Sequence, residues 1–338
     1  MKKLFLLLAL SLASISFGES NYKSLHLVAP EYREAVKDFI VDITTDEQIA
    51  QLQKTYLEEA KNPKVKPTQK ITAPATKNQP KVDMYMFKPK NATSKKLPLI
   101  YHTHGGGYIL GTALQNTDLL DKMANDNNAI VITVEYRLAT EAPFPADVND
   151  AYHGLSYVLK NSDRYGIDAD KVILTGESAG GGLATRLGLM ARDKKEHKIS
   201  GQILVFPMLD YRTGTEEDIY KNEYAGEFTW TAASNRTGWS KLRGNKTISE
   251  KEMPYFSPAL AKDVSNSPKT FIITGDLDLF VNENIDYANK LIKAGVSTEL
   301  HVIPGMVHGY MLLLPDSEQS LQYEELKNRA IQKMFDGK

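Results

Sequence analysis

The chain has 338 residues, of which 42% are hydrophobic and 25% are charged, and its formal net charge is −1. These fractions are typical of a folded globular protein, and they exclude a disordered, collagen-like or multi-span membrane chain. The near-zero charge offers no basic surface for nucleic acid, and the absence of cysteine excludes disulfides, thiolate nucleophiles and iron–sulfur clusters.

The first 18 residues have the organisation of a secretory signal peptide. Two lysines precede an apolar run from Leu4 to Leu12, and small residues follow at Ser16 and Gly18. The alternative, an anchor helix, needs roughly 18 apolar residues to cross a bilayer, and this run is shorter. We therefore expect cleavage after residue 18 and a periplasmic or secreted protein without stable membrane insertion.

Residues 19–80 are expected to form two helices and a linker. Apolar residues at helical spacing cover 32–39 and 46–60, with Asp46 placed as the N-cap of the second helix. Residues 62–80 hold four prolines and few large apolar side chains, which is typical of a surface linker. The two helices therefore need another part of the chain to pack on.

Residues 81–338 alternate short apolar strands with helices. Runs rich in β-branched residues predict strands at 82–87, 97–101, 129–136, 172–175, 203–206, 271–274 and 300–303. Helical periodicity lies between most of them and closes the chain, at 114–125, 148–159, 183–191, 285–294 and 321–335. Buried strands separated by helices predict an α/β fold with a mostly parallel central sheet flanked by helices.

One interval, assigned to residues 207–256 as a cap insertion, breaks this alternation. It contains both tryptophans of the chain, Trp230 and Trp239, among several tyrosines and phenylalanines. Most of these aromatic side chains are expected to pack the insertion onto the core, and one or two to line a pocket.

A nucleophile candidate lies directly after the strand at 172–175. Residues 176–180 read Gly-Glu-Ser-Ala-Gly and precede a helical run, which is the strand–turn–helix context of a nucleophile elbow. Such a turn lifts the hydroxyl of Ser178 above the sheet and directs it at a helix N-terminus. An ordinary glycine-rich turn is the alternative.

A serine hydroxyl needs a base and an acid that orients the base. His308 lies in a glycine-bracketed loop just past the last predicted strand, where an imidazole can reach the serine. Two carboxylates, Asp276 and Asp278, follow the strand at 271–274. The order of the residues along the chain leaves both open as the acid.

A fourth candidate element is the run His104–Gly107, three glycines after a histidine. Consecutive glycines let backbone amides approach a substrate closely, and preorganised amides stabilise the oxyanion of acyl transfer. A phosphate-binding loop is disfavoured, because no Lys-Ser/Thr follows the glycines. A metal pair of His102 and His104 lacks a third ligand at useful spacing.

Four segments together resemble the hormone-sensitive-lipase family of α/β-hydrolases, in family order. They are His-Gly-Gly-Gly-Tyr at 104–108, Tyr-Arg-Leu-Ala-Thr-Glu-Ala-Pro-Phe-Pro-Ala at 136–146, Gly-Glu-Ser-Ala-Gly-Gly at 176–181 and Pro-Gly-Met-Val-His-Gly at 304–309. The resemblance implies an α/β-hydrolase fold, esterase chemistry on short-chain acyl esters without a cofactor, and a cap built from the N-terminal segment and the insertion.

The resemblance also assigns site residues. It favours Asp278 over Asp276, because Tyr287-Ala288 follows at the family's spacing. The oxyanion amides it implies are those of Gly106, Gly107 and Ala179, and we count Gly105 among the candidates of the same loop.

The sequence departs from the family pattern at Glu177, Thr140 and Leu279, and the last of these makes the acid loop less rigid.

These observations predict a serine carboxylesterase with the triad Ser178, His308 and Asp278. The alternatives are an amidase or peptidase with the same triad, and a non-catalytic ligand-binding relative. The expected partner is a small-molecule ester, without nucleic acid or metal, and a homodimer stays open.

Overall fold

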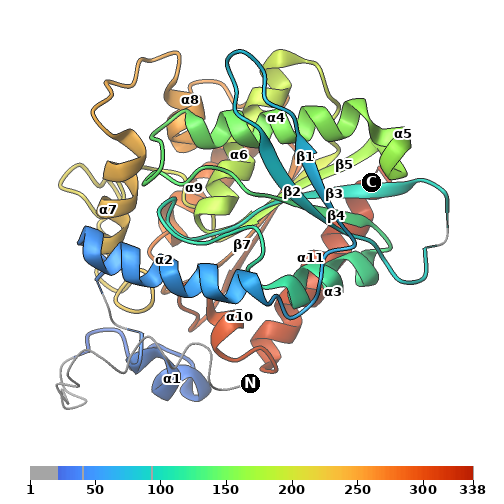
Figure 1. Ribbon diagram of the computed structural model, residues 1–338. Helices are drawn as coiled ribbons and strands as arrows, with labels where there is room; N and C mark the ends of the chain where they lie inside the picture. The colour runs from blue at the N-terminus through green and yellow to red at the C-terminus, as the bar shows by residue number, and fades with distance from the viewer. Residues whose placement is uncertain (1–21, 40–41, 93, 338) are drawn as a thin grey trace.

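In the computed structural model, which describes residues 22–39, 42–92 and 94–337, one eight-stranded sheet runs through the molecule (Figure 1). Its spatial order is β1-β2-β4-β3-β5-β6-β7-β8. The strands are β1 (Gln69–Ala73), β2 (Val82–Phe87), β3 (Leu97–Thr103), β4 (Ile130–Val134), β5 (Ile167–Glu177), β6 (Gly201–Val205), β7 (Lys269–Gly275) and β8 (Thr298–Ile303). β2 pairs antiparallel with β1 and β4, and the remaining pairs are parallel, which confirms the predicted α/β fold.

Helices cover both faces of the sheet, because its strands are apolar on both sides. One face packs against α4 (Ala146–Lys160), α6 (Ala179–Lys194) and α9 (Val281–Lys293). The other face packs against α3 (Thr117–Asn127) and α11 (Glu318–Phe335) (Figure 1). Shorter elements complete the fold: η2 (Pro30–Tyr32), α1 (Arg33–Lys37), α5 (Ser162–Tyr165), α8 (Met253–Phe256), η3 (Pro258–Leu260) and α10 (Tyr310–Leu313).

The segment before β1 differs from its prediction in three respects. The first helix, α1, ends at Lys37 and is preceded by a 3-10 turn. The second, α2 (Asp46–Lys61), is capped by Thr45 and not by Asp46, because Thr45 and Gln48 form a reciprocal capping box. The expected linker contains β1, whose alternating side chains bury Ile71 and Ala73 against the core. The prolines on either side of β1 favoured a linker over a strand, so this edge strand was not predicted from the sequence.

The insertion contains α7 (Ala232–Arg243) and α8, and it has no strand within the described residues. The ring of Trp239 packs edge-on against Tyr108 and Phe256, so this tryptophan belongs to the core. At the left of Figure 1, α7 lies beside the first turn of α2, where Lys241 forms an ion pair with Asp46 at 2.5 Å.

The predicted signal peptide at 1–18 lies outside the described residues. Among the helices that are described, none combines the length and the apolar character that a bilayer crossing requires.

Candidate active site

Ser178 occupies the sharp turn between β5 and α6. Its backbone has φ 57° and ψ −123°, a strained conformation for a residue with a side chain. The turn is held by the Ser178 N–H, which donates to Val205 O at 2.9 Å. Gly180 permits a close approach of α6 to β3, since a β-carbon there would overlap Thr103 O. The hydroxyl is therefore presented at the carboxyl edge of the sheet, with 7% of the residue exposed.

His308 reaches this hydroxyl from the loop after β8. Its Nε2 lies 2.9 Å from Ser178 Oγ. The imidazole is enclosed by aromatic rings, with centroid distances of 4.5 Å to Phe206, 5.3 Å to Phe280 and 6.4 Å to Trp230. These contacts restrict the orientation of the ring.

Asp278 holds the other nitrogen of the same ring. His308 Nδ1–H donates to Asp278 Oδ2 at 2.7 Å, and the Phe280 N–H donates to Oδ1 at 2.8 Å. The carboxylate is fully buried, so both of its oxygens depend on these donors. This pairing places the proton of the neutral imidazole on Nδ1 and leaves Nε2 as the acceptor for the Ser178 hydroxyl.

Asp276 lies in the same loop, but its carboxylate faces the histidine loop and not the imidazole. Its Oδ1 accepts from the Gly305 N–H at 2.7 Å, and the neighbouring Leu277 N–H donates to Met306 O at 3.0 Å. Burial raises the pKa of Asp276. The two aspartates therefore have different contacts: Asp278 binds the imidazole ring, and Asp276 binds the backbone of the loop that carries His308.

The three glycines after His104 lie beside the nucleophile elbow. Gly106 and Gly107 adopt φ values of 126° and 62°, which a residue with a β-carbon rarely adopts. Within the described chain, no backbone hydrogen bond uses the N–H of Gly106, Gly107 or Ala179. Gly105 provides close packing, since a β-carbon there would lie 2.8 Å from Glu177 O.

The two histidines near this loop, His102 and His104, both contact other side chains of the protein. His104 stacks on Tyr136 with ring centroids 4.3 Å apart, and burial lowers the pKa of His104 to about 4. His102 lies 2.9 Å from both Thr133 Oγ1 and Glu177 Oε2. Within the described residues, no group of three His, Asp or Glu side chains is arranged to hold a metal ion.

The geometry of this site agrees with the similarity of the chain to known proteins. A family model that describes the alpha/beta hydrolase fold matches residues 100–312. The chain belongs to the hormone-sensitive-lipase-like family of α/β hydrolases. The family resemblance that the four sequence segments indicated is thereby confirmed.

Named relatives and a solved structure extend the family assignment. The carboxylesterase NlhH of Mycobacterium tuberculosis is 32% identical over 219 residues, which cover 64% of this chain and 67% of NlhH. The ethyl acetate hydrolase of Pseudomonas putida is 29% identical over 213 residues, which cover 63% of this chain and 65% of that protein. The crystal structure of the esterase LipW from Mycobacterium marinum matches with a TM-score of 0.82 and 26% identity, covering 93% of this chain and 98% of LipW. As a member of this family with esterase relatives, the protein is an ester-bond hydrolase.

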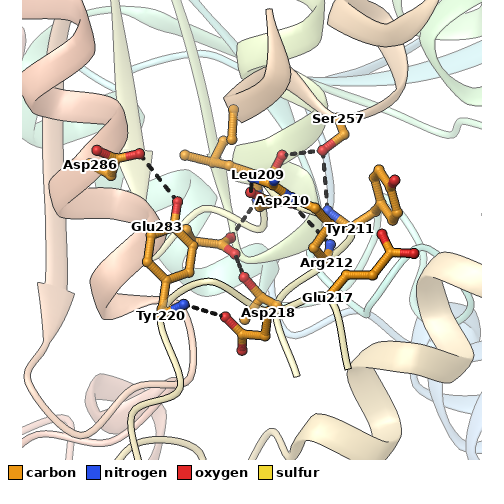
Figure 2. A network of polar contacts seen from close by, with 12 residues as sticks. Leu209, Asp210, Tyr211, Arg212, Glu217, Asp218, Tyr220, Ser257, Glu283 and Asp286 are labelled. Atoms are coloured by element: carbon orange, nitrogen blue, oxygen red, sulfur yellow. Dashed lines mark hydrogen bonds and ion pairs between the residues drawn. The ribbon is translucent and has the colours of Figure 1, made fainter. Parts of the chain in front are cut away.

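Glu283 is not among the residues predicted from the sequence; it lies at the start of α9, five residues after Asp278. Figure 2 shows its carboxylate facing the first residues of the insertion, where the Leu209 N–H donates to Oε1 at 2.6 Å and the Thr213 hydroxyl donates to Oε2. Burial and the nearby carboxylate of Asp210 raise the pKa of Glu283. A fully buried carboxylate thus ties the acid-bearing loop to the insertion.

The same network continues around Asp210. Its carboxylate pairs with Arg212 at 2.7 Å, and Ser257 bridges the chain by accepting from the Tyr211 N–H at 3.1 Å and donating to Leu209 O at 2.8 Å (Figure 2). A carboxylate among the apolar positions of the helix after Asp278 is the signal that could have identified Glu283 in the sequence.

Proposed function

We propose that Ser178, His308 and Asp278 are the catalytic triad of this ester hydrolase. One observation carries the proposal: an unbroken hydrogen-bonded chain runs from Ser178 Oγ to His308 Nε2 at 2.9 Å and from Nδ1 to Asp278 Oδ2 at 2.7 Å. These are the distances at which an imidazole can take the hydroxyl proton as the serine attacks.

The first half of the reaction forms an acyl-enzyme. Ser178 Oγ attacks the ester carbonyl carbon while its proton passes to His308 Nε2, and the carbonyl oxygen becomes an oxyanion. The N–H groups of Gly106, Gly107 and Ala179 donate to that oxyanion, which stabilises the tetrahedral intermediate. The bond to the alkoxy group then breaks, and His308 gives its proton to the departing alcohol.

The second half releases the acid. A water molecule attacks the acyl carbonyl as His308 Nε2 accepts one of its protons. The bond between the acyl carbon and Ser178 Oγ breaks, and the proton returns to the serine. Buried Asp278 stabilises the imidazolium that forms in both halves, since its negative charge lies against Nδ1.

The substrate class in this proposal is esters of short acyl chains. Two observations support it: the indole of Trp230 lies directly against Gly107 in the oxyanion loop, and a relative of the chain is named for the hydrolysis of ethyl acetate. A large side chain this close to the reacting carbonyl leaves little space for a long acyl group.

Hydrolysis of p-nitrophenyl acetate, butyrate and octanoate tests the proposal directly. Ser178→Ala should lower kcat/KM by at least about 10⁴-fold, because the covalent step is lost. The exposed serine variant Ser94→Ala, prepared in parallel, should keep full activity. Substantial activity in Ser178→Ala would refute the triad, and octanoate hydrolysed as well as acetate would refute the short-chain preference. A p-nitroanilide of acetic acid distinguishes an ester hydrolase from an amidase.

We also propose that the chain is exported and cleaved after Gly18, as its N-terminus predicts. Mass spectrometry of protein from the periplasm or medium of the expressing cells should give a chain that starts at Glu19. An intact chain confined to the cytoplasm would refute export.

A further inference from the structure

The longest helix of the N-terminal segment reaches the oxyanion loop through one side chain. Gln53, in the middle of α2, pairs its carboxamide with the backbone of Gly111. The Gly111 N–H donates to Gln53 Oε1 at 2.7 Å, and Gln53 Nε2–H donates to Gly111 O at 2.9 Å. Both peptide groups that flank Gly111 are therefore held by a residue almost sixty positions earlier in the chain.

Gly111 is connected to the proposed oxyanion donors by a single tight turn. The N–H groups of Ile109 and Leu110 both donate to Gly106 O, at 3.1 and 2.9 Å, and Gly111 is the next residue. A β-carbon on Gly111 would lie 2.8 Å from Gly105 O, so the two ends of the loop are in contact. A displacement of Gly111 would therefore move the residues that carry the donors.

The glycines of this loop leave its backbone conformationally free unless other groups hold it. Gly106, Gly107 and Gly111 all adopt positive φ, and glycine has more accessible backbone conformations than any other residue. Oxyanion stabilisation depends on donors that already point at the developing charge before the reaction. A glycine loop acquires that order from the groups that bind its backbone.

We propose that Gln53 is a positioning residue for the oxyanion loop. The proposal rests on the proposed roles of Ser178, Gly106 and Gly107. Gln53 acts through Gly111, and the first turn of α2 also contacts α7 of the insertion through the exposed Asp46–Lys241 ion pair. In this proposal the N-terminal segment contributes to catalysis by ordering backbone amides.

Kinetics of Gln53→Ala test this role, with the exposed neighbour Gln51→Ala as the matched control on the same helix. Loss of one oxyanion donor costs about 10²- to 10³-fold in kcat, and a donor that is only misaligned should cost less, about tenfold. We expect kcat of Gln53→Ala to fall by about tenfold while KM changes less than about twofold. Methyl trifluoromethyl ketone is an inhibitor whose carbonyl carbon is attacked by the Ser178 hydroxyl, so that its oxygen becomes the oxyanion. Its affinity should fall in parallel with kcat.

A charge variant separates positioning from general destabilisation. In Gln53→Glu a carboxylate oxygen faces Gly111 O and repels it, whereas a protonated carboxyl group can donate to it again. The ratio of kcat in Gln53→Glu to that in the wild type should therefore rise as the pH is lowered from 8 to 5. Gln51→Glu carries the same charge change, and its ratio should stay constant.

The outcomes distinguish this proposal from the proposed triad. All assays are performed below the thermal unfolding transition of each variant, so that a loss of folded protein is not measured as a loss of kcat. Unchanged kcat in Gln53→Ala, an effect confined to KM, or equal effects in the Gln51 variants would overturn the positioning role. Those results would leave the triad intact if Ser178→Ala is inactive, and activity in Ser178→Ala would overturn the triad itself.

Discussion

The indole of Trp230 lies so close to Gly107 that a β-carbon on the glycine would overlap the ring. Trp230 comes from the insertion, and Gly107 belongs to the loop after β3. The same tryptophan is 6.4 Å from the His308 ring, measured between centroids, and only 7% of it is exposed. One side chain of the insertion therefore bounds the space beside Gly107 and His308 in which, under the proposed mechanism, the ester carbonyl would react.

Trp230→Ala should enlarge the acyl-binding space. We expect the ratio of kcat/KM for p-nitrophenyl hexanoate to that for the acetate to increase by about tenfold or more, the scale of one or two added methylene contacts. Acetate hydrolysis should not improve, since a short chain does not use the new space. Trp239→Phe serves as the control, because Trp239 packs in the core against Tyr108 and Phe256. An unchanged chain-length profile in Trp230→Ala would contradict the steric role.

The two aspartates after β7 should differ sharply in their effect on rate. Asp278→Asn removes the charge beside His308 Nδ1 and is expected to lower kcat by about 10⁴-fold. In Asp276→Asn the amide oxygen can still accept from the Gly305 N–H, so we expect a decrease of less than about tenfold. The measurement is kcat at saturating p-nitrophenyl acetate for both variants. A greater loss in Asp276→Asn would reverse the assignment of the acid.

His104 should make the protein less stable in mild acid. Burial lowers the pKa of His104 to about 4 in the folded protein, whereas an unfolded histidine titrates near 6.5. The free energy of unfolding is therefore unaffected by protonation of His104 above pH 6.5 and decreases as the pH falls to 4, because the unfolded chain binds a proton that the folded protein excludes. At about 1.4 kcal/mol per pH unit, the gap between the two pKa values corresponds to about 3 kcal/mol.

Urea unfolding between pH 7 and pH 4 measures this effect. His104→Asn lacks the titrating group, so its free energy of unfolding should fall less steeply with decreasing pH than that of the wild type. The exposed His26→Asn variant controls for the removal of a histidine. Equal slopes in His104→Asn and the wild type would show that His104 does not titrate as its burial predicts.

The sequence by itself determined the features that depend on local spacing. The glycines around Ser178, between a strand pattern and a helical pattern, predict a strand–turn–helix junction, and the periodicities of residues 81–338 predict the sheet and its covering helices. The order of Ser178, the aspartates and His308 along the chain was also sufficient to name the nucleophile and base candidates. These inferences rest on backbone preferences and on side-chain periods within a few residues, which the residue types themselves carry.

The tertiary structure alone decided which side chains meet. Spacing along the chain leaves Asp276 and Asp278 equivalent, and the family resemblance favoured Asp278. The packing of the loop is what turns Asp278 to His308 and Asp276 to Gly305. Gln53 is one of several polar residues on a helix, and its pairing with Gly111 requires the docking of α2 on the core. Contacts between distant segments depend on how all the elements pack together, and no pattern confined to one segment contains that information.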